Sequence, residues 1–173
     1  MRKIVIVFGL IAGAIPTLWF QFSKMLGSAH DFENGIYYGY ASMILAFSLI
    51  FVAVKNYRDK ENGGVISFGK AFRIGLYITL IASVVYVIVW LIDYFYFESD
   101  YLQKYGEYMI EKMKTENASQ TAIDAKLAEM KEFEKMYQNP FFNALITFSE
   151  IFPVGLIISL ICALILKRKP SVA

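Results

Sequence analysis

The chain has 173 residues, of which 57% are hydrophobic and 18% are charged, and its formal net charge is +2. So small a net charge excludes the electrostatic footprint of a nucleic-acid-binding protein. A single cysteine and a single histidine exclude an intrachain disulfide and a zinc site built from such residues. Together with a mean hydropathy of +0.48, the composition predicts an integral membrane protein.

Four apolar runs are long enough to cross a bilayer and predict four transmembrane helices. They cover about residues 4–22, 36–54, 74–97 and 141–166. The first run has a basic start and is followed by Gly27-Ser28-Ala29, so a cleaved signal peptide is the alternative for this run. Its length, Pro16 and the aromatic residues near its far end favour a retained helix.

Small residues recur every fourth position along each predicted span, a spacing that lets helices approach closely. We expect these ridges to be the packing surfaces of the bundle. They are Gly9 and Gly13, then Gly35 and Gly39, then Gly75, Thr79 and Ser83, and finally Gly155, Ser159 and Ala163.

Residues 98–140 form the long polar segment of the chain, between the third and fourth spans. Apolar residues recur there at helical spacing in two sets, which predicts a pair of helices folded back on each other as an αα-hairpin. Thr121 followed by Asp124 resembles a capping box at the start of the second of these helices. The sequence thus predicts an all-α protein with a single membrane domain, 1–173, and one helical insertion.

The distribution of basic residues predicts the orientation of the chain. Four spans place both termini on one side, together with the connection between the second and third spans. Ten lysines and arginines lie there, in residues 1–3, 55–73 and 167–169. By the positive-inside rule these segments are cytoplasmic and residues 98–140 are extracytoplasmic.

Glu150 is the most specific local feature, because an acid within a membrane span costs about 2.5–3.5 kcal/mol and needs a partner or a purpose. Pro153 follows three residues later and removes the donor for the carbonyl of Ser149. We expect Glu150 to face the bundle interior, as either a structural hydrogen-bonding group or part of a coupling site. Asp93 and Glu33 are expected at the same outer end, and the three acids form the candidate polar site with Pro153.

Four segments carry a resemblance to a known family: residues 33–40, 55–58, 64–72 and 150–156. They read Glu-Asn-Gly-Ile-Tyr-Tyr-Gly-Tyr, Lys-Asn-Tyr-Arg, Gly-Val-Ile-Ser-Phe-Gly-Lys-Ala-Phe and Glu-Ile-Phe-Pro-Val-Gly-Leu. In their order and spacing the chain resembles the four-span bacterial membrane proteins filed as a domain of unknown function, number 4199. The resemblance implies a bacterial inner-membrane protein and no particular activity.

The sequence favours a non-enzymatic scaffold or accessory subunit of the cell envelope, which would contact a membrane or envelope protein through residues 98–140. The alternative is a small oligomeric transporter or ion-coupling protein that uses the acids at the outer end. An enzyme is disfavoured because the chain has no nucleophile elbow, zinc motif or phosphate loop. The lipid bilayer, an envelope protein and further copies of the chain are the expected partners, and nucleic acid, cofactors and metals are not expected.

Overall fold

The computed structural model describes residues 1–25 and 31–169, and in these the chain is all α-helical with no β-strand. Four helices are long and apolar enough to cross a membrane: α1 (Arg2–Met25), α2 (Gly35–Asn56), α3 (Phe68–Tyr96) and α6 (Pro140–Leu166). A π-helical segment, η1 (Tyr57–Glu61), continues α2. The two shorter helices, α4 (Tyr101–Thr115) and α5 (Gln120–Tyr137), are polar. The predicted all-α class and the four apolar helices are confirmed.

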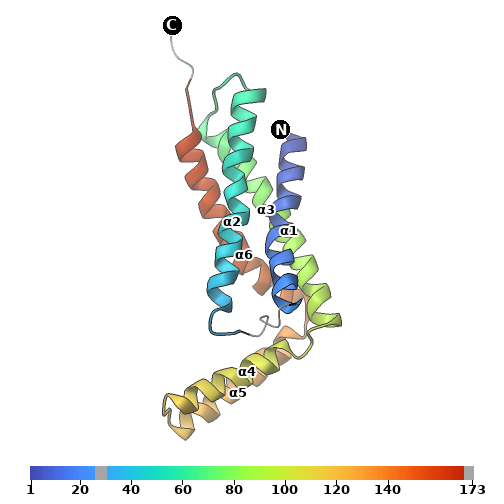
Figure 1. Ribbon diagram of the computed structural model, residues 1–173, viewed down its shortest axis with the longest axis vertical. Helices are drawn as coiled ribbons and strands as arrows, with labels where there is room; N and C mark the ends of the chain where they lie inside the picture. The colour runs from blue at the N-terminus through green and yellow to red at the C-terminus, as the bar shows by residue number, and fades with distance from the viewer. Residues whose placement is uncertain (26–30, 170–173) are drawn as a thin grey trace.

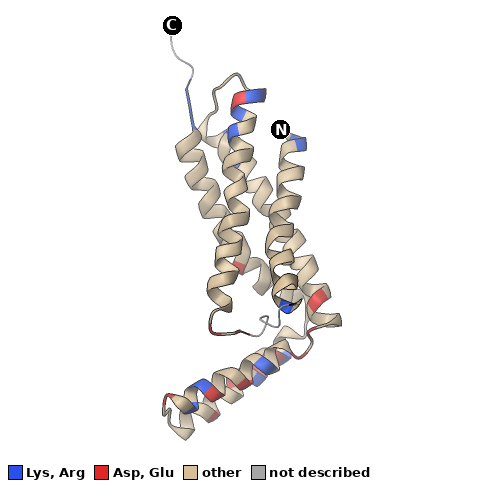
Figure 2. Cartoon of the chain, viewed as in Figure 1, with Lys and Arg blue, Asp and Glu red and all other residues tan. Residues whose placement is uncertain are grey.

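The four long helices lie side by side, and α4 and α5 lie next to each other beyond one end of this bundle (Figure 1). The N-terminus, the α2–α3 connection and the end of α6 are at the opposite end. Lysines and arginines colour that opposite end blue (Figure 2). The three basic segments identified in the sequence therefore meet at one end of the bundle. The Gly27-Ser28-Ala29 cleavage motif lies outside the described residues.

Capping residues fix where the helices begin. The Ser67 side chain accepts a hydrogen bond of 3.3 Å from the Lys70 backbone N–H, as expected for an N-cap at the start of α3. The predicted capping box at Thr121 is wrong, because α5 begins earlier and its N-cap is Ser119, whose side chain accepts from the Ala122 backbone N–H. Ser119 is the better position because the preceding Asn117 takes a positive φ of 58° and turns the chain there.

Helix α3 packs against α1 through the glycine pair of the first span. A Cβ atom added at Gly9 would lie 2.8 Å from the Cβ of Ile81, and one added at Gly13 would lie 2.8 Å from the Cβ of Val85. Both glycines are buried. The missing side chains thus let the two backbones approach, as the spacing predicted.

The opposite contact of α3 is with α6, where small residues from both helices interdigitate. A Cβ atom at Gly155 would lie 2.5 Å from the Thr79 methyl carbon and 2.7 Å from the Phe47 ring of α2. Thr79 and Ser159 share a buried hydrogen bond of 3.1 Å between their hydroxyl oxygens. Three helices therefore meet at Gly155.

The small-residue ridge of α2 has no such partner among the described residues. A Cβ atom added at Gly35 or Gly39 would meet none of their heavy atoms within 4 Å. The residues around them, among them Ile36 and Tyr37, are exposed. The ridges of α1, α3 and α6 thus serve the bundle, whereas that of α2 is left open.

Gly155→Ala is expected to destabilise the protein, because Thr79 and Phe47 are fully buried and cannot move away freely. An overpacked core of this kind lowers the apparent melting temperature by about 3–10 °C. Gly39→Ala is the matched control, since it adds the same methyl group where nothing is near. Scanning fluorimetry in a mild detergent measures both; an equal effect of the two variants would contradict the packing described.

Candidate functional site

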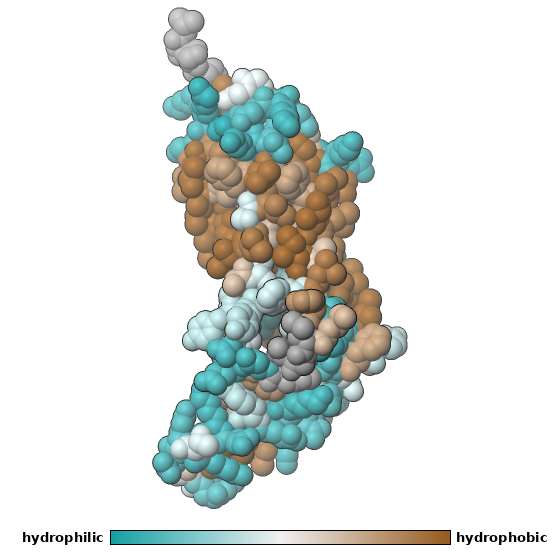
Figure 3. Space-filling model, in the orientation of Figure 1, coloured by the Kyte–Doolittle hydropathy of each residue, from teal (hydrophilic) through white to brown (hydrophobic). Residues whose placement is uncertain are grey.

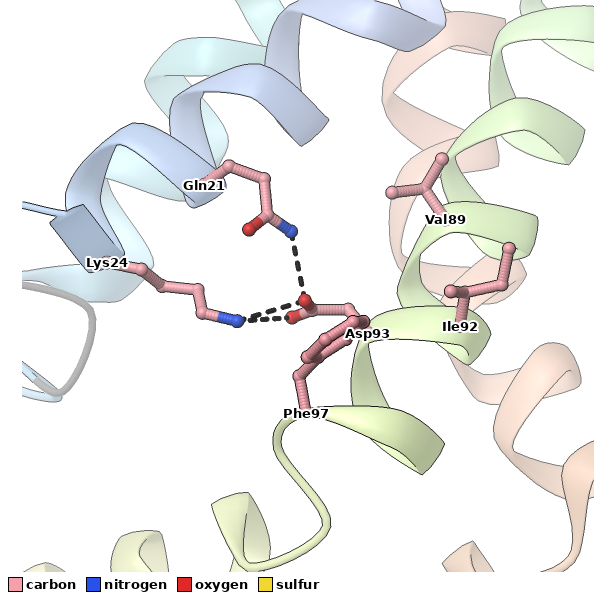
Figure 4. A pocket seen from close by; sticks show the side chains of 6 residues that line it. All are labelled: Gln21, Lys24, Val89, Ile92, Asp93 and Phe97. Carbon is pink, nitrogen blue, oxygen red and sulfur yellow. Dashed lines mark hydrogen bonds and ion pairs between the residues drawn. The ribbon is translucent and has the colours of Figure 1, made fainter.

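The candidate functional site is an ion cluster where the C-terminal ends of α1 and α3 meet. Lys24, in the last turn of α1, lies between two carboxylates (Figure 4 shows its contact with Asp93). Its Nζ atom is 2.9 Å from Oδ1 of Asp93 on α3 and 3.1 Å from Oε1 of Glu98. Gln21, one turn earlier on α1, donates a hydrogen bond of 3.0 Å to the same Asp93 oxygen. One end of α1 is therefore tied to the end of α3.

The end of α3 holds both carboxylates in position. The backbone N–H groups of Phe97 and Glu98 both donate to the carbonyl oxygen of Asp93, each at 2.9 Å. These bonds terminate the helix and turn Glu98 back toward Lys24. The backbone hydrogen bonds at the end of α3 thus set the positions of Asp93 and Glu98 relative to each other, independently of Lys24.

The cluster is largely shielded from solvent. Asp93 is 5% exposed and Glu98 is 8% exposed. The rings of Phe20 and Phe97 lie 5.7 Å and 5.9 Å from the Lys24 nitrogen. A buried carboxylate is tolerated when it is paired and hydrogen-bonded, and loss of the partner is strongly destabilising. The cluster can therefore act as a structural clasp, in which Lys24 is bound by two carboxylates.

A pocket of about 250 Å³ opens beside the clasp (Figure 4). Gln21, Lys24 and Asp93 supply its polar lining, and the remaining residues are Val89, Ile92 and Phe97. Among the described residues no group of three or more His, Cys, Asp or Glu side chains could hold a metal ion. The polar residues of the pocket thus lie on one side of it, and they already form hydrogen bonds with one another.

Of the acids singled out from the sequence, the structure brings only Asp93 into this cluster. Glu33 is an exposed residue before α2, and neither its carboxylate nor that of Glu150 forms a hydrogen bond or ion pair with another described residue. Pro153 is exposed and α6 continues through it as one helix. Within the described part of the chain, the side chains of Glu33, Asp93 and Glu150, the three acids of the candidate polar site, thus make no direct contact with one another.

The Glu150 side chain is exposed in the described structure. The buried face of α6 includes Asn143, Thr147, Ile151 and Gly155. At about 100° per residue, Glu150 lies about 20° from Asn143 around the helix axis, at the edge of that face. That Glu150 faces the bundle interior stays a prediction. Its electrostatic neighbours are three tyrosines: Tyr86 of α3, Tyr101 of α4 and Tyr137 of α5.

A second polar group joins α3, α5 and α6. The Trp90 ring N–H donates a hydrogen bond of 2.9 Å to the Tyr137 hydroxyl, which lies 3.4 Å from the Thr147 hydroxyl. Thr147 in turn donates to Oδ1 of Asn143, and the Asn143 Nδ2 atom is buried without a partner in the described structure. Burial raises the pKa of Tyr137, which keeps its hydroxyl neutral and able to donate.

Aromatic contacts complete the joint between the bundle and the α4–α5 pair. The Tyr101 ring lies edge-on to Trp90 at 5.4 Å, and the Tyr137 ring lies edge-on to Tyr94 at 5.2 Å. Burial raises the pKa of Tyr101 to about 12, so it also remains neutral. We name this set, Trp90, Tyr94, Tyr101 and Tyr137, the aromatic joint.

Sequence reasoning missed both the clasp and the aromatic joint. Gln21 and Lys24 are three residues apart at the end of α1, and this spacing places them on one face of the helix. This spacing could have indicated that Gln21 and Lys24 contact the same group. The aromatic joint gave no such local signal, because the pairing of Trp90 and Tyr94 with Tyr101 and Tyr137 depends on contacts between distant parts of the chain.

Residues 7–168 match the model of one protein family, which is described as "Protein of unknown function (DUF4199)". The matched range contains all of α2 to α6 and most of α1, so the resemblance seen in the sequence is confirmed. No curated protein and no solved structure matches the chain.

Lys24→Met is expected to destabilise the protein because it leaves Asp93 and Glu98 buried without their shared cation. A loss at the lower end of that seen for buried pairs corresponds to a melting temperature lower by about 5–10 °C. Lys104→Met is the control, since the Lys104–Asp100 pair is exposed. The control is expected to change the melting temperature by at most about 3 °C. Similar melting temperatures for both variants would mean that the clasp contributes little.

Proposed function

The chain belongs to the DUF4199 family, whose description names no activity, and we propose that it is a non-enzymatic scaffold or accessory subunit of the bacterial cell envelope. In this proposal the four long helices anchor the protein in the inner membrane. The α4–α5 pair then contacts a membrane or envelope protein.

The observation that carries this proposal is the aromatic joint. Two helices attached only by their connecting loops would move independently of the bundle. Here Tyr101, the first residue of α4, and Tyr137, the last of α5, both pack on α3. Phe32, just before α2, also contacts the rings of Tyr105 and Tyr108 on α4, at 5.4 Å and 5.6 Å. These contacts hold α4 and α5 in one position relative to the bundle, which is what a surface that binds a partner protein requires.

The distribution of charge supports a defined orientation for the proposed membrane protein. All ten basic residues of the three short segments are at the bundle end opposite to α4 and α5 (Figure 2). The space-filling view shows a brown, apolar band around the bundle between two teal ends (Figure 3). By the positive-inside rule, the basic end with both termini is cytoplasmic and the α4–α5 pair is extracytoplasmic.

The orientation is tested with single cysteines in the full-length protein. Lys60→Cys in η1 should resist an impermeant thiol reagent in intact cells and react after lysis. Glu116→Cys, between α4 and α5, should react in intact cells. The parent protein, whose Cys162 is buried, provides the background. Labelling at position 60 without lysis would reverse the proposed orientation.

The partner contact is tested by placing a photo-crosslinking residue at an exposed position of α5. Leu127 is 42% exposed on α5, and Ile157 is 57% exposed in the middle of α6. We expect crosslinking at Leu127 to give a defined adduct with another protein, and crosslinking at Ile157 to give lipid adducts. A scan of exposed α4 and α5 positions that yields no protein adduct would contradict the proposed contact.

Glu150 favours the second candidate function, a small transporter or ion-coupling protein. It is an exposed acid within a candidate span, with no ion-pair partner in the described residues. A charged group at such a depth is expected to serve transport when no structural partner satisfies it.

The two functions differ in a flux assay with protein in liposomes. A coupling role for Glu150 predicts proton or cation flux that Glu150→Gln abolishes and Glu132→Gln, on exposed α5 surface, preserves. The scaffold proposal predicts no flux above that of empty liposomes for any of the three proteins. Flux that depends on Glu150 would therefore contradict the scaffold proposal and support the transporter proposal.

A further inference from the structure

The basic end of the bundle holds a concentration of positive charge that the chain does not neutralise. Residues 1–3, 55–73 and 167–169 contain ten lysines and arginines but only two acids, Asp59 and Glu61. Glu61 is 2.6 Å from the N-terminal amine, and Asp59 is 2.6 Å from the Arg58 guanidinium. Both acids are therefore already paired.

Most of the remaining cations at this end are exposed and form no ion pair within the described part of the chain. They are Arg2, Lys3, Lys55, Lys60, Arg73, Lys167, Arg168 and Lys169. Lys70 differs, since it bonds to the Asn62 side chain and lies 5.0 Å from the Tyr57 ring.

Main-chain bonds hold basic residues from distant parts of the sequence together. The residues after α6 pair with the α2–α3 connection, because Ile66 and Arg168 exchange backbone hydrogen bonds of 3.0 Å and 2.8 Å. Arg58 also donates to the Leu166 carbonyl at 3.3 Å. Lys55 and Arg168 both interact electrostatically with Asp59, so they lie around the same carboxylate. This cluster is a fixed feature of the fold.

The depth of these residues indicates what they contact. Lys55 directly follows the apolar part of α2, Arg73 directly precedes the apolar run of α3, and Lys167 directly follows α6. In a helix that crosses a bilayer, such positions are at the level of the lipid headgroups. Basic pockets between transmembrane helices on this side of a membrane bind anionic headgroups.

We propose that the basic end, centred on Lys55 and Arg168, binds the phosphate headgroup of an anionic phospholipid. The proposal rests on the membrane location and orientation in the proposed function, but it does not depend on a protein partner. Several exposed cations facing one phosphate provide the charge complementarity. The neighbouring apolar helices provide a surface for the acyl chains.

The experiment is native mass spectrometry of the full-length protein in a neutral detergent, with added phosphatidylglycerol or phosphatidylcholine. We expect tighter binding of phosphatidylglycerol. Each removed cation should weaken that binding by about fivefold, so Lys55→Gln with Arg168→Gln should weaken it by about 25-fold. Lys131→Gln with Lys135→Gln, on the exposed surface of α5, is the matched control and should not change it.

Equal binding of the two lipids would overturn the proposal, and so would unchanged phosphatidylglycerol binding by the Lys55 and Arg168 double variant. Soluble glycerol phosphate is the third probe. If it binds as tightly as the lipid, the site is one for free phosphate compounds and the lipid assignment is wrong. A protein that keeps its melting temperature but loses the lipid preference supports the site even if no envelope partner is found.

Discussion

Helix α3 depends on small residues at both of its contacts, and much of the structure depends on α3. Toward α1 the small residues are on the partner, at Gly9 and Gly13. Toward α6 they alternate between the two helices, and the Thr79–Ser159 hydrogen bond fixes their register. Lipid offers no hydrophobic drive for helix association, so dispersion contacts and such hydrogen bonds provide it. The position of α3 in turn places both the clasp and the aromatic joint, which are built on its outer end.

Much of this fold was predictable from local pattern. Apolar runs gave the four long helices within a few residues, and Ser67 gave the start of α3. The four-residue spacing of small residues identified the packing ridges of α1, α3 and α6, yet it gave equal weight to Gly35 and Gly39, which pack on nothing in the described structure. A ridge indicates that another helix can approach, and the sequence of one helix does not say whether it does.

The polar residues were harder to predict because their role depends on what lies opposite. Asp93 and Glu150 are both acids in apolar helices, and sequence reasoning treated them alike. The chain returns Lys24 to Asp93 from 69 residues away, whereas no cation of the described chain reaches Glu150. Asp93 is thereby buried in a paired state, the condition in which a membrane acid is structurally tolerable. Glu150 lies at the edge of the buried face of α6, about 20° from Asn143 at about 100° per residue, and its side chain is exposed in the described structure.

The two ends of the bundle use charge in opposite ways. At the end that carries α4 and α5, three cations are paired within the chain: Lys24 with Asp93 and Glu98, Lys104 with Asp100, and Lys126 with Glu129. Recognition there would rest on shape and hydrogen bonding, which require the helix pair to be held still, and the aromatic joint does this. At the basic end, exposed cations outnumber the acids that could pair with them. Long-range attraction acts on any anionic surface nearby without a closely fitted contact. The fold thus combines an end held by the aromatic joint, where acids outnumber cations, with a basic end, and each is suited to a different class of neighbour.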